Sequence, residues 1–204
     1  MQPLSDGRLV LTTDGSAERV GQPRLLKEEI LTEIVWNGLE EPSRESCRIE
    51  SDSHGVIVVS EIEGGSGACS YRLRLTEGWE FIDLVVRAGD RELELRITDR
   101  GWEVDGETRP DLQAAQEVDI SVSPLSNTLP IRRLGLAVGE SADITTAYIR
   151  VPELDVTTDP QRYTRTGENE YLYESRDSDF HRSIRVDGSG LVIEYPGLFI
   201  REKH

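Results

Sequence analysis

Alternation of apolar and polar residues with a period of two is the feature of this sequence that most limits its fold. Residues 71–75 and 92–98 alternate without interruption, and residues 56–62 form a short, strongly apolar run. Segments of this kind form strands that bury one face and leave the other in water. Further strands are predicted at residues 81–86, 117–122, 144–151, 171–174, 184–186 and 191–195.

Turn residues separate these predicted strands at intervals of roughly ten positions, as in an antiparallel meander. Residues 99–101, 166–169 and 187–190 contain Gly, Asn or Asp, which tight hairpins favour. Helical periodicity is weak, with room for a turn or two at residues 25–33 and 112–116. A twisted sheet of ten or more strands does not stay open and flat. We therefore predict an all-β fold, a single curled antiparallel sheet (a β-roll or barrel-like sheet) with few short helices.

The beginning of the chain differs from the rest. It is polar, has Asp-Gly turn pairs, and has room for only one short strand, at residues 8–12. We interpret residues 1–25 as a loosely attached N-terminal segment and residues 26–204 as a single β-roll domain. A chain of 204 residues is long enough for one domain to bury about 70% of the surface that it exposes when unfolded.

Acidic residues outnumber basic ones by 39 to 23, which gives a formal net charge of −16 at pH 7. Such a field repels phosphate backbones, so nucleic acid is not expected as a partner. Only Lys27 and Lys203 are lysines, and the other basic residues are arginines. Excess carboxylate with few lysines keeps a surface hydrated in concentrated salt, which predicts a halophilic, cytoplasmic protein. A genome rich in arginine codons is the alternative explanation for the arginines, although not for the net charge.

Neither a membrane span nor a metal site is predicted. The opening residues MQPLSDGR lack the features of a secretory signal, and no apolar run approaches the ~20 residues of a transmembrane helix. Cys47 and Cys69 are expected to be reduced thiols, and His54, His181 and His204 are too scattered to bind a metal. No cofactor is predicted. The sequence has no G-x-S-x-G motif and no paired Cys and His, which favours a role other than that of an enzyme.

The densest run of unusual residues is EVDISVSPLSNTLPIRR, at residues 117–133. In the strand predicted at its start, Glu117 and Asp119 share a face about 7 Å apart. Two carboxylates at this spacing suit acid–base work on a glycosidic bond. The alternative, which we favour, is that one or both pair with Arg132 or Arg133 in a structural ion pair.

The middle of this run, residues 126–130, is interpreted as a capped turn. Ser and Asn side chains bond nearby backbone groups, and Pro130 keeps the residue before it out of the helical region. In a strand, the consecutive residues Arg132 and Arg133 point to opposite faces, so one of them is expected to point inward. An inward guanidinium group needs a carboxylate partner, or an anionic or polyhydroxylated ligand.

Three stretches together resemble the putative glycolipid-binding family, formerly a domain of unknown function. They are residues 117–140, which contain NTLPIRR, residues 160–163 (PQRY) and residues 191–198 (LVIEYPGL). The resemblance is strong over residues 117–201 and weaker before them, and Glu117 stands where the family has an aspartate. It implies a single-domain, curled antiparallel β-roll, similar to the lipoprotein carriers of the bacterial envelope, with a cavity for glycolipid.

Aromatic rings beside Arg, Asp and Asn side chains are the groups that sugar recognition requires. For any single ring, packing in the core is the commoner role. The candidate ligand-binding residues are Trp79, Trp102, Glu117, Asp119, Asn127, Arg132, Arg133, Arg162, Tyr163, Tyr173 and Tyr195.

The sequence is compatible with three functions. The first is non-catalytic binding of an amphiphilic small molecule, such as a glycolipid, in a cavity of the curled sheet. The alternative is a small hydrolase that acts on a glycoside or an ester, with Glu117 and Asp119 as its carboxylates. The third is a protein-interaction module without a small ligand. The resemblance and the missing nucleophile motifs favour binding.

Overall fold

The computed structural model describes residues 30–65 and 68–203. In these ranges the strands are β1 (Ile30–Gly38), β2 (Ser43–Asp52), β3 (Gly55–Gly64), β4 (Cys69–Leu75), β5 (Phe81–Ala88), β6 (Arg91–Thr98), β7 (Gly101–Val104), β8 (Glu107–Thr108), β9 (Glu117–Ile120), β10 (Ser141–Arg150), β11 (Asp155–Gly167), β12 (Glu170–Ser175), β13 (His181–Val186), β14 (Val192–Tyr195) and β15 (Phe199–Arg201). They form one sheet in the order β8-β7-β6-β5-β4-β3-β2-β1-β15-β14-β13-β12-β11-β10-β9. The prediction of an all-β fold is confirmed.

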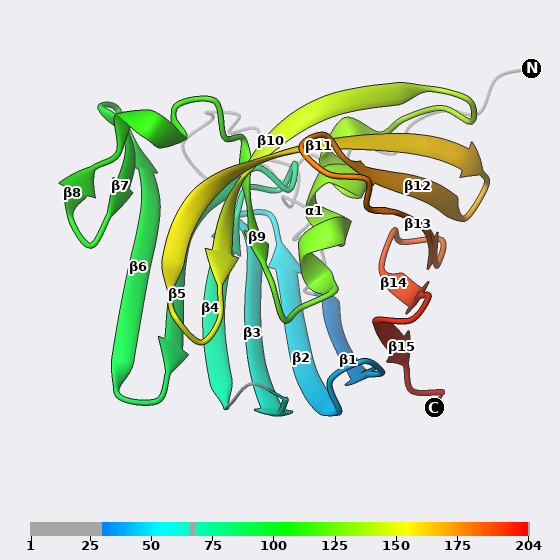
Figure 1. Cartoon of the computed structure of the whole chain (residues 1–204), viewed down its shortest axis with the longest axis horizontal. Helices are drawn as coiled ribbons and strands as arrows, with labels where there is room; N and C mark the ends of the chain where they lie inside the picture. The colour runs from blue at the N-terminus through cyan, green and yellow to red at the C-terminus, as the bar shows by residue number, and fades with distance from the viewer. Residues whose placement is uncertain (1–29, 66–67, 204) are drawn as a thin grey trace, which may run out of the picture.

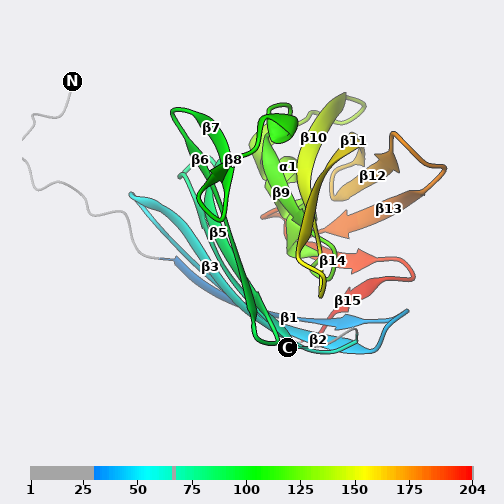
Figure 2. The ribbon, with the colours of Figure 1, turned by 60° about the vertical axis from the view of Figure 1, so that its left-hand side comes forward.

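The sheet has two arms that meet where β1 pairs with β15, with Trp36 opposite Arg201. The first arm runs from β1 to β8 and the second from β15 back to β9. Strand pairs are antiparallel, as predicted, except that β9 and β10 run parallel. Figures 1 and 2 show the two arms curving toward each other. Since β8 and β9 end the strand order without pairing to each other, the described sheet is curled but not closed.

The period of two places an apolar face inside the curl. In β4, Tyr71, Leu73 and Leu75 are buried, whereas Arg72 and Arg74 between them are exposed. Leu73 lies opposite Val58 of β3 on one side and Leu84 of β5 on the other, and both partners are fully buried. Burial of such cross-strand neighbours stabilises the arm, because each apolar side chain removed from water contributes about 1.5–3 kcal/mol.

One α-helix, α1 (Leu125–Leu134), lies between the two arms (Figure 2). The first seven of its residues are buried. Leu125 and Leu129, one turn apart, belong to the main core. The helix ends at Gly135, whose φ of 56° is the left-handed conformation that glycine adopts most easily.

This helix corrects the prediction of a capped turn at residues 126–130 and a strand containing Arg132 and Arg133. Pro130 and the short polar side chains disfavour a helix locally, but packing on both arms outweighs that preference. The helical turns predicted elsewhere differ too, since β1 already starts at Ile30 and the turn near residue 112 is the 3₁₀ helix η1 (Pro110–Leu112). The segment 1–25 and the strand predicted at 8–12 lie outside the described residues.

The core has two parts. The main cluster joins the first arm, α1 and strands β9 to β11 of the second arm, and a smaller one lies in the second arm around Tyr163, Tyr171, Tyr173 and Tyr195. Cys47 and Cys69 are buried free cysteines. No helix in the described part of the chain is long and apolar enough to cross a membrane.

Candidate functional site

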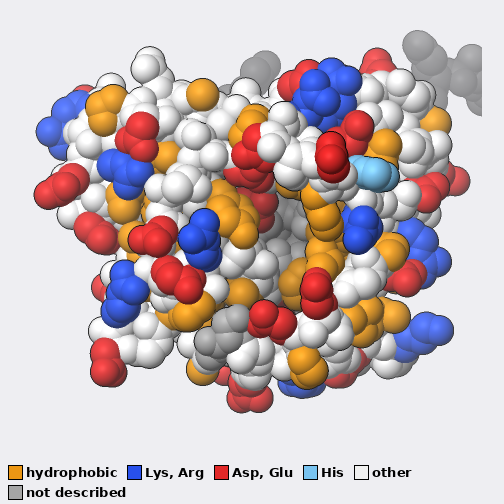
Figure 3. Space-filling view, viewed as in Figure 1, with side chains coloured by type: hydrophobic (Ala, Val, Ile, Leu, Met, Phe, Trp, Pro, Cys, Tyr) orange, Lys and Arg blue, Asp and Glu red, His pale blue; other side chains and the backbone are white. Residues whose placement is uncertain are grey.

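The curl of the sheet leaves a hollow made of two adjoining pockets. The polar pocket has a volume of about 420 Å³ and is lined mainly by β9 to β12, the loop before α1 and the turn between β14 and β15. The second pocket, of about 470 Å³, has a mixed lining, with Ile62, Val122 and Val151 beside the acidic residues Glu40 and Glu41. Both pockets share Ser121, Tyr148, Arg150, Leu198 and Phe199. Figure 3 shows one face of the molecule hollowed near its middle, with hydrophobic and charged side chains around the depression.

Two carboxylates meet in the polar pocket through one amide group. Gln161 Nε2 donates to Asp119 Oδ2 and to Asp159 Oδ2, each at 2.7 Å. The register explains the meeting. Asp159 and Gln161 are two residues apart on β11 and so share a face, while the pairing of Asp119 with Tyr148 brings β9 alongside β10. We call these three residues the Asp119–Gln161–Asp159 cluster.

Burial sets the electrostatics of this cluster. Loss of water raises the pKa of Asp119 to about 6, although the hydrogen bond from Gln161 opposes the shift, and the negative charge of Asp159 adds to it. Burial likewise raises the pKa of Asp159. Both carboxyl groups are therefore harder to ionise than solvent-exposed aspartates. With a pKa of about 6, Asp119 is largely ionised at neutral pH and accepts hydrogen bonds from donors in the pocket.

Aromatic rings form another wall of the polar pocket. Tyr173 and Tyr195 line it, and their ring centroids lie 6.3 Å apart in an edge-to-face arrangement. Tyr163 lies behind them, 5.5 Å from Tyr173, and its hydroxyl donates to Asn127 Oδ1 at 2.9 Å. Asn127 itself lines the pocket from α1. These contacts fix the rings and the amide in place around the pocket.

Four of the residues proposed from the sequence, Asp119, Asn127, Tyr173 and Tyr195, thus line one pocket. Glu117 does not join them. Its carboxylate is fully buried and accepts two hydrogen bonds from Arg133, from Nη2 at 2.8 Å and from Nε at 3.1 Å. This is the structural ion pair that the sequence favoured for one of these acids.

The other sequence-derived candidates lie outside both pockets. The Arg132 guanidinium stacks on the Trp79 ring, 4.2 Å from its centroid, and donates to the Ser189 carbonyl oxygen at 2.6 Å. Arg162 pairs with Asp143 at the surface. Trp102 packs in the main core and donates from Nε1 to a backbone carbonyl. Each of these side chains has a partner within the fold.

Sequence reasoning missed Asp159 and Gln161, which join Asp119 in the cluster, and it missed Tyr148 and Arg150, which line the pocket with Asp159. A local signal existed for the first two, since a period of two places them on one face of the strand that contains PQRY. Nothing in the local pattern tells that this face meets Asp119, which is 42 residues from Gln161 in the chain. That contact depends on the parallel pairing of β9 with β10, which places β9 one strand away from β11.

A second buried carboxyl group, Glu45, lies directly behind the hollow. Three hydroxyl groups donate to its Oε1, from Ser60 and Tyr71 at 2.7 Å and from Ser123 at 2.8 Å. Ser123 also lines the polar pocket. Burial raises the pKa of Glu45 to about 7, against these hydrogen bonds. Glu45 Oε2 is buried and has no hydrogen-bond partner among the described residues.

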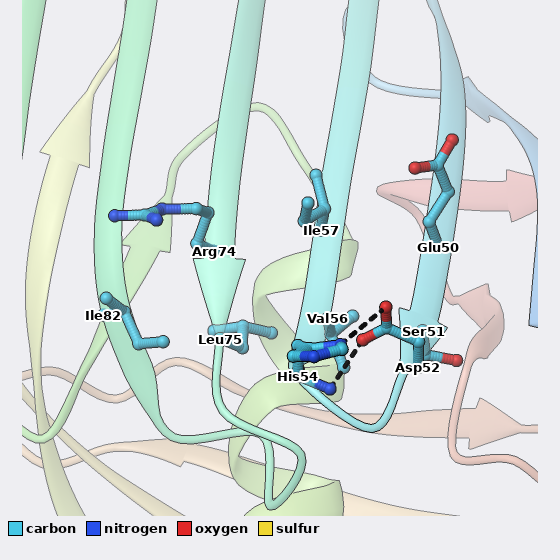
Figure 4. A pocket seen from close by; sticks show the side chains of 10 residues that line it. Glu50, Ser51, Asp52, His54, Val56, Ile57, Arg74, Leu75 and Ile82 are labelled. Atoms are coloured by element: carbon cyan, nitrogen blue, oxygen red, sulfur yellow. Dashed lines mark hydrogen bonds and ion pairs between the residues drawn. The ribbon is translucent and has the colours of Figure 1, made fainter. Parts of the chain in front are cut away.

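A smaller pocket, of about 210 Å³, lies at the β2–β3 hairpin (Figure 4). His54 contacts Asp52 across the turn through its backbone N–H and its ring. Arg74 on its other side pairs with Asp83. The charged groups here satisfy one another, and within the described residues no group of His, Cys, Asp and Glu is arranged to hold a metal ion.

Comparison with known proteins gives the family. The sequence model of the putative glycolipid-binding family matches residues 33–201. The chain belongs to this family. The match contains every residue that lines the polar pocket. It also confirms the resemblance seen in the sequence.

A solved structure agrees with this assignment. The crystal structure of a DUF1089 family protein from Pseudomonas aeruginosa is 35% identical and superposes with a TM-score of 0.62. The alignment covers 90% of this chain and 96% of that one. No curated protein matches the chain.

Proposed function

We propose that this protein binds an amphiphilic ligand, of the glycolipid class that its family's description names, in the hollow of the curled sheet and without catalysing a reaction. The observation that carries the proposal is the shared wall of the two pockets. One hollow therefore offers the carboxylates and rings of the polar pocket beside an apolar wall of Ile62, Val122 and Val151. A molecule with a polar end and an apolar end requires this combination. Each pocket is within the size range of about 300–1,000 Å³ that is usual for small-molecule sites.

The two ends of the ligand follow from the linings. A sugar headgroup in the polar pocket meets the carboxylates of Asp119 and Asp159 and the rings of Tyr173 and Tyr195. The hydrocarbon part then extends past Leu198 toward the apolar walls of the second pocket. Burial of the chain contributes about 0.8 kcal/mol for each CH₂ group removed from water.

The position of Glu117 argues against hydrolysis by the pair Glu117 and Asp119. A glycosidase needs two carboxyl groups that face the same bond of the substrate. Of the pair Glu117 and Asp119, only Asp119 lines the pocket, and Arg133 binds both oxygens of Glu117.

The test measures binding of a glucosyl diacylglycerol, presented in an uncharged polyoxyethylene detergent, by native mass spectrometry and calorimetry. The key variant is Leu198→Trp, which fills the wall common to both pockets. Its control is Val138→Trp, at a site that is 59% exposed and outside both pockets. We expect a one-to-one adduct for the wild type and the control, and affinity at least about tenfold lower for Leu198→Trp.

Two results would contradict the proposal. One is a clean ligand-free mass for the wild type with this lipid and with lipid extracts. The other is equal affinity of wild type and Leu198→Trp, which would place the ligand elsewhere on the molecule.

A further inference from the structure

We propose that the Asp119–Gln161–Asp159 cluster is the headgroup clamp of this hollow, and that it selects headgroups that donate hydrogen bonds and carry no negative charge, such as neutral or amino sugars, over phosphate headgroups. This inference rests on the proposed function and specifies the chemistry of its ligand. Four features of the polar pocket support it.

The first feature is the number of acceptors that the cluster presents. An ionised carboxylate has about four lone-pair sites. The single amide nitrogen of Gln161 supplies one hydrogen each to Asp119 and Asp159. Both carboxylates line the pocket and so have acceptor capacity left for a ligand. Hydroxyl and ammonium groups satisfy such acceptors, whereas an ionised phosphate diester has no hydrogen to give.

The second feature is the strain that the cluster carries. Oδ2 of Asp119 and Oδ2 of Asp159 each lie 2.7 Å from Gln161 Nε2. The two acidic oxygens are therefore no farther apart than twice that distance. Gln161 is 1% exposed, and its Oε1 has no hydrogen-bond partner among the described residues. A buried polar atom without a partner costs about 1–3 kcal/mol. Such a cost is typical of sites kept for binding rather than for stability.

The third feature is the charge of the lining. The polar pocket has three carboxylates, those of Asp119, Asp159 and Asp177, against one guanidinium group, that of Arg150. Arg150 makes no ion pair within the described part of the chain. The pocket is therefore net negative, and a phosphate entering it is repelled. A sugar hydroxyl both donates to the carboxylates and accepts from Arg150.

The fourth feature is the pair of rings at the wall. Tyr173 and Tyr195 stand edge to face beside the cluster. The apolar C–H face of a pyranose packs on an aromatic ring, while its hydroxyl edge faces polar groups. Carboxylates, a guanidinium group and rings together fit a sugar, whereas a phosphate that reached the donors of Arg150 would lie beside three carboxylates.

The experiment compares two lipids with the same acyl chains, glucosyl diacylglycerol and phosphatidylmethanol, whose headgroup is an ionised phosphate diester without a hydroxyl group, in the same uncharged detergent at constant ionic strength. For the wild type we expect affinity for the glucosyl lipid at least about tenfold higher. Asp119→Asn should reduce that preference about tenfold, mainly by weakening glucosyl lipid binding. Asp143→Asn is the matched control, because Asp143 pairs with Arg162 at the surface and lies outside the polar pocket. It should keep the wild-type preference.

Asp119 is packed inside the fold, so a second variant tests the charge argument without touching the cluster. Asp177→Lys changes an exposed residue of the pocket lining and should improve phosphatidylmethanol binding several-fold. If the wild type binds both lipids equally, or if neither variant changes their ratio, the clamp is wrong although the proposed function stands. If the wild type binds neither lipid, the proposed function itself fails.

Discussion

The carboxyl group of Glu45 is a titratable group that the proposed binding site does not use. Its side chain is 3% exposed, and three hydroxyl groups point at one of its two oxygens. The thiols of Cys47 and Cys69 are its other polar neighbours, and its charge helps to raise their pKa values. Desolvation outweighs the three hydrogen bonds, so the ionised form of Glu45 is disfavoured in the folded state.

Replacement of Glu45 by Gln should remove a pH dependence of stability. Because the pKa rises from 4.5 to about 7 on folding, the stability contributed by the neutral acid is complete below pH 4.5 and is lost as the pH rises through about 7. The difference corresponds to about 3 kcal/mol. The test is urea unfolding at pH 4.5 and at about pH 8. Between these two pH values, the free energy of unfolding of the wild type should fall by about 3 kcal/mol more than that of Glu45→Gln.

Glu61→Gln, at an exposed position of β3, is the control and should follow the wild type at both pH values. Parallel pH dependence of the wild type and Glu45→Gln would show that Glu45 ionises normally in the folded protein. It would also show that the carboxyl group of Glu45 is not desolvated in its position behind the pocket.

At the scale of elements, one ion pair connects β9 to α1. Arg133 is largely buried and holds Glu117, which is completely buried. Burial raises the pKa of Glu117, and the bonds from Arg133 oppose that shift. The pair therefore fixes the helix against the strand that carries Asp119, and so positions one wall of the polar pocket.

Loss of one partner should be costly. Arg133→Met leaves a buried carboxylate without compensation, and we expect a loss of about 3–5 kcal/mol in the free energy of unfolding. The double variant Glu117→Gln, Arg133→Met should recover much of that loss. Arg162→Met, which breaks the surface pair with Asp143, is the control and should cost less than about 1 kcal/mol. A cost of Arg133→Met as small as that of the control would refute the role of the pair.

The elements also show which parts of the fold are readable from the sequence. Strands such as β4 and β6 carry their pattern locally, in the alternation of buried Leu with exposed Arg or Glu, and were predicted close to their bounds. Helix α1 was missed because Pro130 and its neighbours favour a turn in isolation, and only burial between the arms makes them helical. The residue types favoured an ion pair of Glu117 or Asp119 with Arg132 or Arg133, and the fold forms it between Glu117 and Arg133. The partners of Asp119 were not predicted, since they depend on the pairing of β9 and β11 with the two edges of β10.

On the scale of the whole molecule, the net charge of −16 acts on an open, curled sheet. Many carboxylates are paired with arginines across neighbouring strands, as in Arg74–Asp83 and Arg185–Glu194. Such exposed pairs contribute little, about 0–1 kcal/mol each. The remaining negative charge repels itself and opposes the compact state.

Salt should therefore stabilise the protein. Between 0.1 M and 1 M salt the screening length falls from about 10 Å to about 3 Å, which weakens long-range repulsion more than short contacts. We expect the Tm to rise by about 5 °C or more over this range, measured by calorimetry in KCl. An unchanged or falling Tm would argue against adaptation to a salty cytoplasm and leave codon usage as the explanation for the arginines.

The central claim is that the hollow of the curled sheet holds an amphiphile with its polar end at the Asp119–Gln161–Asp159 cluster. The most direct measurement is the crystal structure of the protein with glucosyl diacylglycerol. The claim predicts sugar density within hydrogen-bonding distance of Asp119 and Asp159, and acyl-chain density along Leu198 and Val122. A hollow that contains only solvent, or lipid bound on the outer face of either arm, would contradict it.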